Sequence, residues 1–288
     1  MKLGLIFMGT LLMACSARGT QFDDGQPNGT TTLDPGRGPG TPKMGTPEVC
    51  DGADNDGNGI TDDVDVNHDG VCDCLKIATL GRKGDAGQGN IFASWLTSRS
   101  DMGAVDLKDK VLTKSVLAPF SVIVAQNVSE IGRTYSASEV SAMSDWINAG
   151  GGLLTLTGFA GSSEVDNVNT LLVPYGMSYG TQSILFGGGH TLPVTHWNTH
   201  PVTQGITRIG VDNGYPVLGA GTAIASEGFD VLKAREVGMG HVLVWGDEWI
   251  TYDSEWSAHP DYQVQALWIN ILKWLSPATE CQVPLPPK

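Results

Sequence analysis

The chain has 288 residues, 41% of them hydrophobic, and a formal net charge of −14 at pH 7. This length is sufficient for one medium-sized domain with a hydrophobic core and some additional segments. The acidic balance excludes a nucleic-acid-binding protein, since those proteins present a basic face to phosphate, and it disfavours anionic lipid surfaces as partners.

The first residues are predicted to be an export signal. Lys2 precedes an apolar run from Leu3 to Met13, which has the length of a signal peptide and is too short to span a bilayer. The run ends in Leu-Met-Ala-Cys and resembles the lipobox of bacterial lipoproteins. The resemblance implies a lipoprotein signal over residues 1–15, with Cys15 cleaved and lipidated, and Ser16 favours the outer membrane. An ordinary secretory signal is the alternative.

Residues 16–47 are predicted to be a flexible linker. Gly, Pro, Thr and Asp dominate this stretch, and no hydrophobic periodicity runs through it. Such a composition buries too little apolar surface to offset the entropy lost on ordering. We therefore expect an exported protein that is held on the membrane by a lipid anchor and a tether, not by a spanning helix.

Residues 48–74 contain nine acidic residues and no Lys or Arg. When Asp54 is counted as position one, oxygen-bearing side chains recur at positions three, five, nine and twelve, with Gly59 at position six. The spacing restarts at Asp65, with Gly70 at position six. Ca²⁺ takes six to eight oxygen ligands, which alternate residues of a tight loop can supply, and glycine permits the turn. Oxygen ligands also favour Ca²⁺ over zinc or copper.

The predicted calcium ligands comprise eight side chains and two backbone carbonyls. They are Asp54, Asp56, Asn58, Ile60 (carbonyl), Asp62, Asp65, Asn67, Asp69, Val71 (carbonyl) and Asp73. This pattern resembles the thrombospondin type 3 repeat, and "EVCDGADNDGNGITDD" resembles a short metal-binding motif of exported bacterial proteins, E-x-C-D-G-x-D-N-D. Both resemblances imply structural Ca²⁺. The alternative is a solvated acidic linker, in which His68 is an ordinary exposed residue.

Four cysteines follow Cys15, and an even number in an exported protein indicates two disulfides. Cys72 and Cys74 are too close in sequence to pair without strain, so each should pair with Cys50 or Cys281. The last helix is expected to return to the edge where the first strand begins, just after Cys74. We therefore predict the pairs Cys50–Cys72 and Cys74–Cys281.

From residue 75 onward, strand and helix patterns alternate. The expected strands cover residues 75–81, 120–126, 152–158, 222–227, 229–236 and 241–247, and the expected helices 90–98, 136–152, 164–172 and 261–277. Ser136 and Glu139 form a predicted capping box, and apolar residues recur at helical spacing from Val264 to Leu275. This alternation predicts an α/β fold with a mainly parallel sheet and helices on both faces.

The stretches "SDWINAGGGLLTLTG", "HWNTHPVTQGI" and "GMGHVLVWGDEWI" resemble the class I glutamine amidotransferase-like superfamily, and the second resembles its trehalose-utilisation-type members. The resemblance covers residues 75–276, which leaves 277–288 as a tail with Cys281. It implies a flavodoxin-like three-layer sandwich.

Enzymatic members of that superfamily carry a Cys nucleophile after the strand that corresponds to 152–158. Here Phe159 or Ala160 occupies that place, and no G-x-S-x-G elbow surrounds Ser162 and Ser163. The segment "HPD", residues 259–261, then has no nucleophile to activate. Amidotransferase activity is therefore disfavoured.

Ligands of such sheets bind beyond the carboxyl ends of the strands. The expected loop there, residues 247–261, holds aromatic rings beside carboxylates, which suits sugar stacking and hydroxyl hydrogen bonds. Its candidate ligand-binding residues are Asp247, Glu248, Trp249, Tyr252 and Trp256. Packing of these rings at the sheet edge is the alternative. A zinc site at His190, His196 and His200 is disfavoured against structural histidines.

These observations predict a non-catalytic, calcium-binding envelope lipoprotein whose α/β domain binds a glycan or a protein partner. One alternative is a carbohydrate-active hydrolase or lyase, which would use carboxylates among Asp247, Glu248, Asp253 and Glu255 at a suitable separation. A second alternative is a purely structural envelope component.

Overall fold

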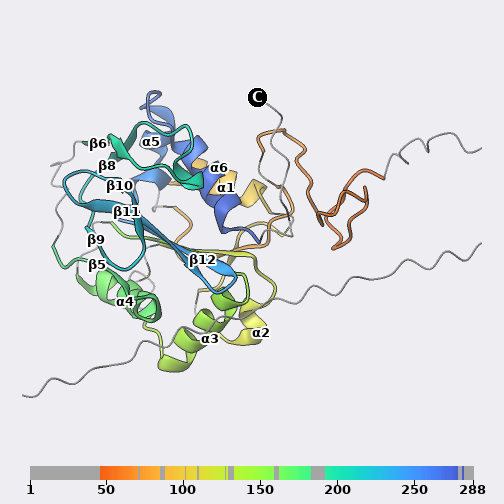
Figure 1. Cartoon of the computed structure of the whole chain (residues 1–288), viewed down its shortest axis with the longest axis horizontal. Coiled ribbons are helices and arrows are strands. Elements are labelled where there is room, and N and C mark those ends of the chain that lie inside the picture. Colours follow the sequence, from red (N-terminus) through yellow and green to blue (C-terminus); the bar gives the residue numbers. More distant parts are fainter. Residues whose placement is uncertain are drawn as a thin grey trace, which may run out of the picture. The chain divides into compact units, whose positions relative to one another are not determined.

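An eight-stranded β-sheet forms the centre of the computed structural model (Figure 1). The structure describes residues 46–70, 72–84, 88–100, 102–108, 110–126, 128, 133–158, 162–182, 192–277 and 281, apart from the side chains of residues 162–164. Across the sheet the strand order is β2-β1-β3-β4-β12-β11-β10-β7. In that order the strands are Val105–Asp106, Ile77–Gly81, Val122–Gln126, Gly152–Leu156, Gly240–Trp245, Asp230–Val237, Thr222–Ser226 and His196–Trp197.

The sheet has a parallel half and an antiparallel extension. Strands β2, β1, β3, β4 and β12 run parallel to one another. Every residue of β1, β3 and β4 is buried, because helices cover both faces of a parallel sheet and apolar side chains are needed on each. Strands β11, β10 and β7 then add on in antiparallel fashion.

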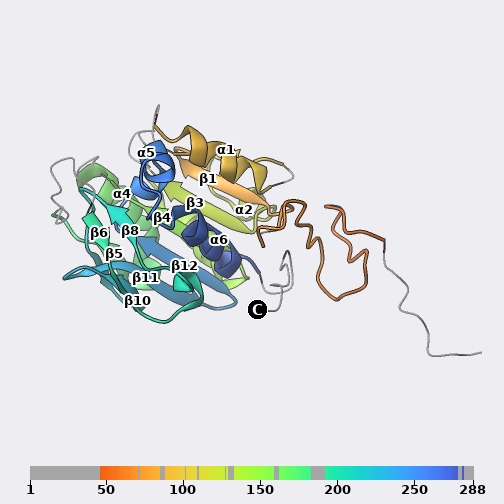
Figure 2. The same ribbon diagram turned by 90° about the horizontal axis from the view of Figure 1, so that it is seen from above.

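Helices cover both faces of the sheet. Helices α1 (Asn90–Ser98), α5 (Asp253–Ser257) and α6 (Val264–Leu275) lie on one face, where Figure 2 shows them together, and share one hydrophobic core. Helices α2 (Lys114–Leu117) and α3 (Ala137–Asn148) lie on the other face with α4. Helix α4 spans Ser162–Leu172. The predicted flavodoxin-like three-layer α/β sandwich is therefore confirmed.

Two predicted helices have the expected local features. Glu139 accepts a hydrogen bond from the backbone N–H of Ser136 (3.0 Å), and the Ser136 hydroxyl accepts one from the N–H of Glu139 (3.3 Å), so the capping box of α3 is present. The apolar stripe of α6 is buried in full, and it comprises Val264, Leu267, Trp268, Ile271, Leu272 and Leu275. Burial of such a stripe is the main source of stability for a surface helix.

Two small sheets were not predicted. Strand β5 (Met177–Tyr179) pairs with β9 (Val217–Gly219), and β6 (Leu192–Val194) pairs with β8 (Ile209–Val211). Strands of three residues are too short to show a hydrophobic period. The described residues also include the 3₁₀ turns Val173–Tyr175, Pro201–Thr203 and Trp249–Thr251.

The predicted disulfide pairing is wrong. The structure joins Cys50 to Cys74 and Cys72 to Cys281, with Cα–Cα distances of 5.3 and 5.1 Å. The prediction assumed that the tail stops beside the first strand. Instead Cys281 lies against the acidic segment, where its N–H donates to the carbonyl of Thr61 (3.0 Å). The sulfur atoms of Cys72 and Cys281 both lie beside the carbonyl of Asp62 (2.9 and 3.4 Å), so Cys72 is the cysteine that Cys281 meets.

No helix within the described ranges is long and apolar enough to cross a membrane. Cys15, the predicted signal and the predicted linker up to residue 45 lie outside the residues that the structure describes.

Candidate functional site

The acidic segment, residues 48–74, folds its two predicted repeats into the same local shape. Asp54 accepts hydrogen bonds from the backbone N–H groups four and five residues later (3.1 and 2.8 Å). Asp65 does the same (3.1 and 2.8 Å). Gly59 and Gly70, at position six, have φ of +93° and +77°, as the tight turn requires. The spacing that occurs twice in the sequence therefore forms the same backbone turn twice in the structure.

The second repeat faces two basic side chains of the α/β domain. The buried guanidinium of Arg99, at the end of α1, lies 2.6 Å from Asp69 and 3.2 Å from Asp73. Burial lowers the pKa of Lys273 on α6, and the charges of Asp65 and Asp69 oppose that shift. The domain therefore supplies positive charge to this repeat directly.

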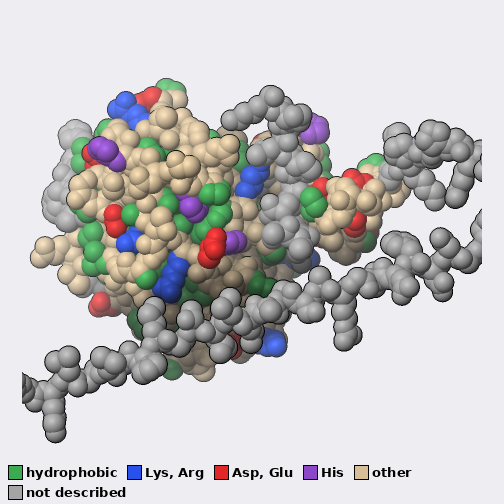
Figure 3. Space-filling model, in the orientation of Figure 1, with side chains coloured by type: hydrophobic (Ala, Val, Ile, Leu, Met, Phe, Trp, Pro, Cys, Tyr) green, Lys and Arg blue, Asp and Glu red, His purple; other side chains and the backbone are tan. Residues whose placement is uncertain are grey.

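The first repeat instead brings three carboxylates together. One oxygen from each of Glu48, Asp56 and Asp63 lies within 4.8 Å of the others. They line a hollow of about 270 Å³, and acidic side chains are visible on this segment at the right of Figure 3. Glu48 Oε2 and Asp63 Oδ1 have no hydrogen-bond partner. An all-oxygen donor set with unpaired carboxylate oxygens fits a hard cation such as Ca²⁺.

Only Asp56 of the predicted ligand set belongs to this group. Most other members hold the backbone of the segment; those whose side chains accept backbone N–H groups are Asp54, Asn58, Asp62, Asp65, Asn67 and Asp73. Val71 lies outside the described residues. Sequence reasoning missed Glu48 and Asp63, although Glu48 is the first residue of the E-x-C-D-G-x-D-N-D pattern and was a usable signal.

The strand-end loop, residues 247–261, follows β12 at the carboxyl edge of the parallel strands. Asp247 is fully buried, and its carboxylate accepts the backbone N–H groups of Asp212, Glu248 (2.5 Å) and Trp249 (3.1 Å). Burial raises the pKa of Asp247, and the bond from Asp212 opposes that rise. The side chain is therefore committed to holding the turn.

Glu248 takes part in a second buried network. Its carboxylate accepts from the side-chain amide of Gln126, at the end of β3 (3.3 Å), and from the Tyr252 hydroxyl (3.2 Å). The same amide donates to the hydroxyl of Thr251 (2.8 Å). This network joins the end of β3 to the strand-end loop that follows β12.

The three aromatic residues of the loop are half-buried. The rings of Trp249 and Tyr252 stack on each other at 5.2 Å, whereas Trp256 packs against the hydrophobic core and donates to the carbonyl of Ile250 (3.0 Å). Asp253 accepts the N–H of Ile91 in the first turn of α1 (2.8 Å). The five predicted ligand residues therefore do not form one exposed surface.

Glu255 is the most unusual acid of this loop. Its side chain is 1% exposed, and neither carboxylate oxygen has a hydrogen-bond partner. Burial raises the pKa of Glu255 to about 8, and the charge of Asp261 adds to the rise. This carboxyl is therefore largely protonated at neutral pH.

The other candidate residues are dispersed. Phe159, Ala160 and His190 lie outside the described residues, and the side chains of Ser162 and Ser163 are not described. His196 faces Glu227 (3.3 Å), while the ring of His200 packs on Trp274 at 5.0 Å. His259 stacks on Tyr262 at 4.9 Å. Within the described part of the chain, no group of potential metal ligands includes a histidine.

No protein-family model and no curated protein matches this sequence. Among solved structures, a cytoplasmic protein from Salmonella typhimurium LT2 is 14% identical with a TM-score of 0.54, and the match covers 70% of this chain and 100% of that one. A second Salmonella typhimurium cytoplasmic protein is 12% identical, with a TM-score of 0.48 and coverage of 70% and 100%. A protein described as ThuA-like from Bacteroides uniformis is 12% identical, with a TM-score of 0.39 and coverage of 70% and 91%. At these identities the first similarity supports the α/β fold alone.

Proposed function

We propose that this chain is a calcium-stabilised, non-catalytic binding protein that is attached to the bacterial envelope by a lipid at Cys15. The observation that carries the proposal is the convergence of Glu48, Asp56 and Asp63 in the first acidic repeat. Three carboxylates at this separation repel one another unless a cation lies among them. Ca²⁺ would offset most of their negative charge and link residue 48 to the turn of the repeat.

The α/β domain is, in this proposal, the part that binds a glycan or an envelope protein. It belongs to the amidotransferase-like fold of trehalose-utilisation type and works without a thiol nucleophile, because the four cysteines after Cys15 form disulfides. The four carboxylates named for the alternative of a hydrolase or lyase either hold backbone N–H groups or are buried. Asp247 holds a turn, Asp253 accepts the N–H of Ile91 at the start of α1, and Glu248 and Glu255 are buried.

Calcium titration of the purified full chain tests the proposed calcium site. We expect saturable uptake with Kd in the range ~10⁻⁴–10⁻³ M that is typical of exported calcium modules. Asp63→Asn and Glu48→Gln should each weaken uptake by about tenfold or more, since each removes a charged ligand. Asp51→Asn is the charge-matched control, because Asp51 lies in the same segment but outside the group. Equal weakening by the control, or no uptake at millimolar calcium, would remove the proposal.

Fractionation of cells that express the chain tests the proposed lipid anchor at Cys15. Replacement of Cys15 by Ser should release the expressed chain from the membrane fraction, because a single lipid-modified residue is the expected attachment. A chain that stays in the membrane fraction after this replacement is not anchored as proposed.

A further inference from the structure

Outside the acidic segment and the strand-end loop, a cavity lies at the opposite edge of the sheet. It has a volume of about 580 Å³ and lies where β1, β3 and β4 begin, beside α2 and α3. This amino-edge cavity is lined by residues just before those strands, among them Lys76, Ser121 and Gly151. Its volume falls within the range of small-molecule sites, roughly 300–1,000 Å³.

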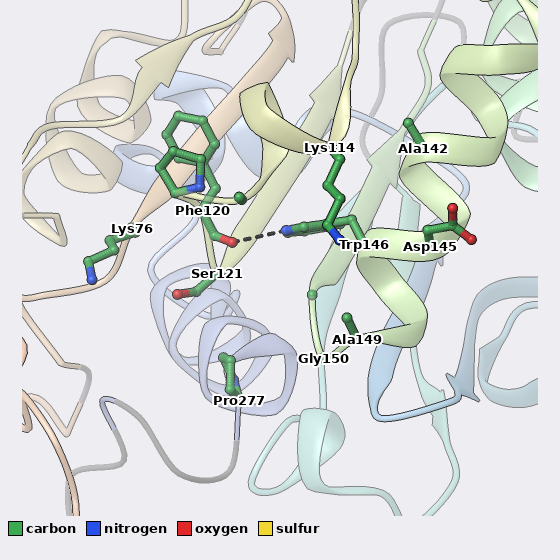
Figure 4. Close-up of a pocket in the computed structure, with 13 residues that line it drawn as sticks. Lys76, Lys114, Phe120, Ser121, Ala142, Asp145, Trp146, Ala149, Gly150 and Pro277 are labelled. Atoms are coloured by element: carbon green, nitrogen blue, oxygen red, sulfur yellow. Dashed lines mark hydrogen bonds between the residues drawn. The ribbon is translucent and has the colours of Figure 1, made fainter.

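Two unpaired lysines give the cavity its charge. Within the described residues, the ammonium groups of Lys76 and Lys114 have neither a hydrogen-bond partner nor an ion pair, whereas Arg99, Arg133 and Lys233 are all paired. In Figure 4, Phe120 and Ser121 lie between the two lysines. In a chain of net charge −14, a concave surface with two free cations is a local site for an anion.

A fixed aromatic ring forms part of the wall. The indole N–H of Trp146 donates to the carbonyl of Phe120 (3.1 Å), which sets the orientation of the ring. The backbone of Gly151 lies against the ring, since a Cβ there would be 2.4 Å from its atoms. The carboxylate of Asp145 points away from Trp146 in Figure 4. The cavity therefore combines a rigid apolar face, a serine hydroxyl, two ammonium groups and the carboxylate of Asp145.

We infer that the amino-edge cavity binds an acidic sugar, with the carboxylate bonded to Lys114, the positive charge of Lys76 adding to the attraction, and the apolar face of the ring against Trp146. A carboxylate gains charge-assisted hydrogen bonds from ammonium groups. The C–H face of a pyranose matches an indole, and Ser121 can bond a sugar hydroxyl. This inference rests on the proposal that the α/β domain is a binding module, and it gives that module a site and a ligand class.

Calorimetry or ligand-observed NMR on the full chain, with glucuronate as the probe, tests the inference. We expect millimolar or tighter binding that falls by about tenfold or more in Lys76→Gln/Lys114→Gln, because both positive charges are lost. Lys108→Gln is the matched control, since Lys108 is exposed and lies outside the cavity, and it should leave binding within about twofold. Thermal unfolding of each variant checks that the fold is intact.

Two comparison ligands test which chemical class of ligand the cavity binds. Glucose should bind at least about tenfold more weakly than glucuronate, since it lacks the charge, and inorganic phosphate should bind weakly, since it lacks the ring. Equal binding of glucose or phosphate, or an unchanged affinity in the double variant, would overturn the inference. If sugar binding fails while calcium uptake at Glu48, Asp56 and Asp63 persists, only the inference about the cavity falls.

Discussion

Two acid-rich regions of this protein use similar hydrogen bonds in different surroundings. Asp54, in the acidic segment, accepts three backbone N–H groups (2.7, 3.1 and 2.8 Å) on an exposed turn. Asp247, in the strand-end loop, also accepts three, but it is fully buried. The first region leaves other carboxylates exposed or half-buried and able to meet a cation, whereas the second closes Asp247, Glu248 and Glu255 inside the fold. Acidic composition therefore does not identify a ligand site until burial is known.

The largest expected difference between the two regions is the loss in free energy of unfolding when the aspartate is replaced by alanine. Asp247→Ala leaves three buried N–H groups without an acceptor and should lower the free energy of unfolding by about 4 kcal/mol. Asp54→Ala exposes its three donors to water, which replaces the lost bonds, and should cost about 1 kcal/mol or less. Urea unfolding of both variants measures this, and similar losses would contradict the comparison.

A second expected effect concerns Arg99, the buried cation at the end of α1 that pairs with the acidic segment. Arg99→Met leaves Asp69 and Asp73 facing each other without their partner and should lower the free energy of unfolding by about 3 kcal/mol. Millimolar calcium should recover part of the loss, because a divalent cation can supply the missing charge.

Arg208→Met is the control for Arg99. Arg208 pairs with Asp261 at 3.3 Å on the surface, where ion pairs contribute little, so its loss should cost about 0.5 kcal/mol or less. If both variants behave alike in denaturant, Arg99 does not act as a buried partner of the segment.

The smallest effect is a pH dependence in the strand-end loop. Burial raises the pKa of Glu255 from 4.5 to about 8, so the contribution of this group to stability is full below pH 4.5 and is lost as the pH rises toward 8. The slope is at most about 1.4 kcal/mol per pH unit.

Glu255→Gln should remove this slope and should be more stable than the natural chain at pH 8, with little difference at pH 4. Melting temperatures across that range provide the measurement. Parallel pH profiles for the two chains would show that Glu255 is not held protonated by the fold.

Much of the fold could be predicted from local signals. The capping box at Ser136 and the stripe from Val264 to Leu275 are properties of single helices, and both are present. The buried strands β1, β3 and β4 are continuous apolar runs. These features depend on residues that are neighbours in the sequence, so no tertiary information is required to recognise them.

The errors and omissions concern contacts between distant residues. The pairing of Cys72 with Cys281 depends on how far the tail extends past α6, which no local pattern encodes. The role of Arg99 depends on the placement of α1 beside the acidic segment. The packing of Trp256 against the core was not predicted, because an aromatic residue in a loop has no periodicity to show which side is buried.

The bond between Cys72 and Cys281 spans 209 residues and makes a covalent ring of nearly the whole α/β domain. A protease that cuts one exposed loop inside this ring breaks the backbone without separating the two pieces. Such a nicked molecule would still migrate as one chain in a non-reducing gel and would split into fragments only after reduction. The closed ring therefore lets a nicked copy keep its parts together.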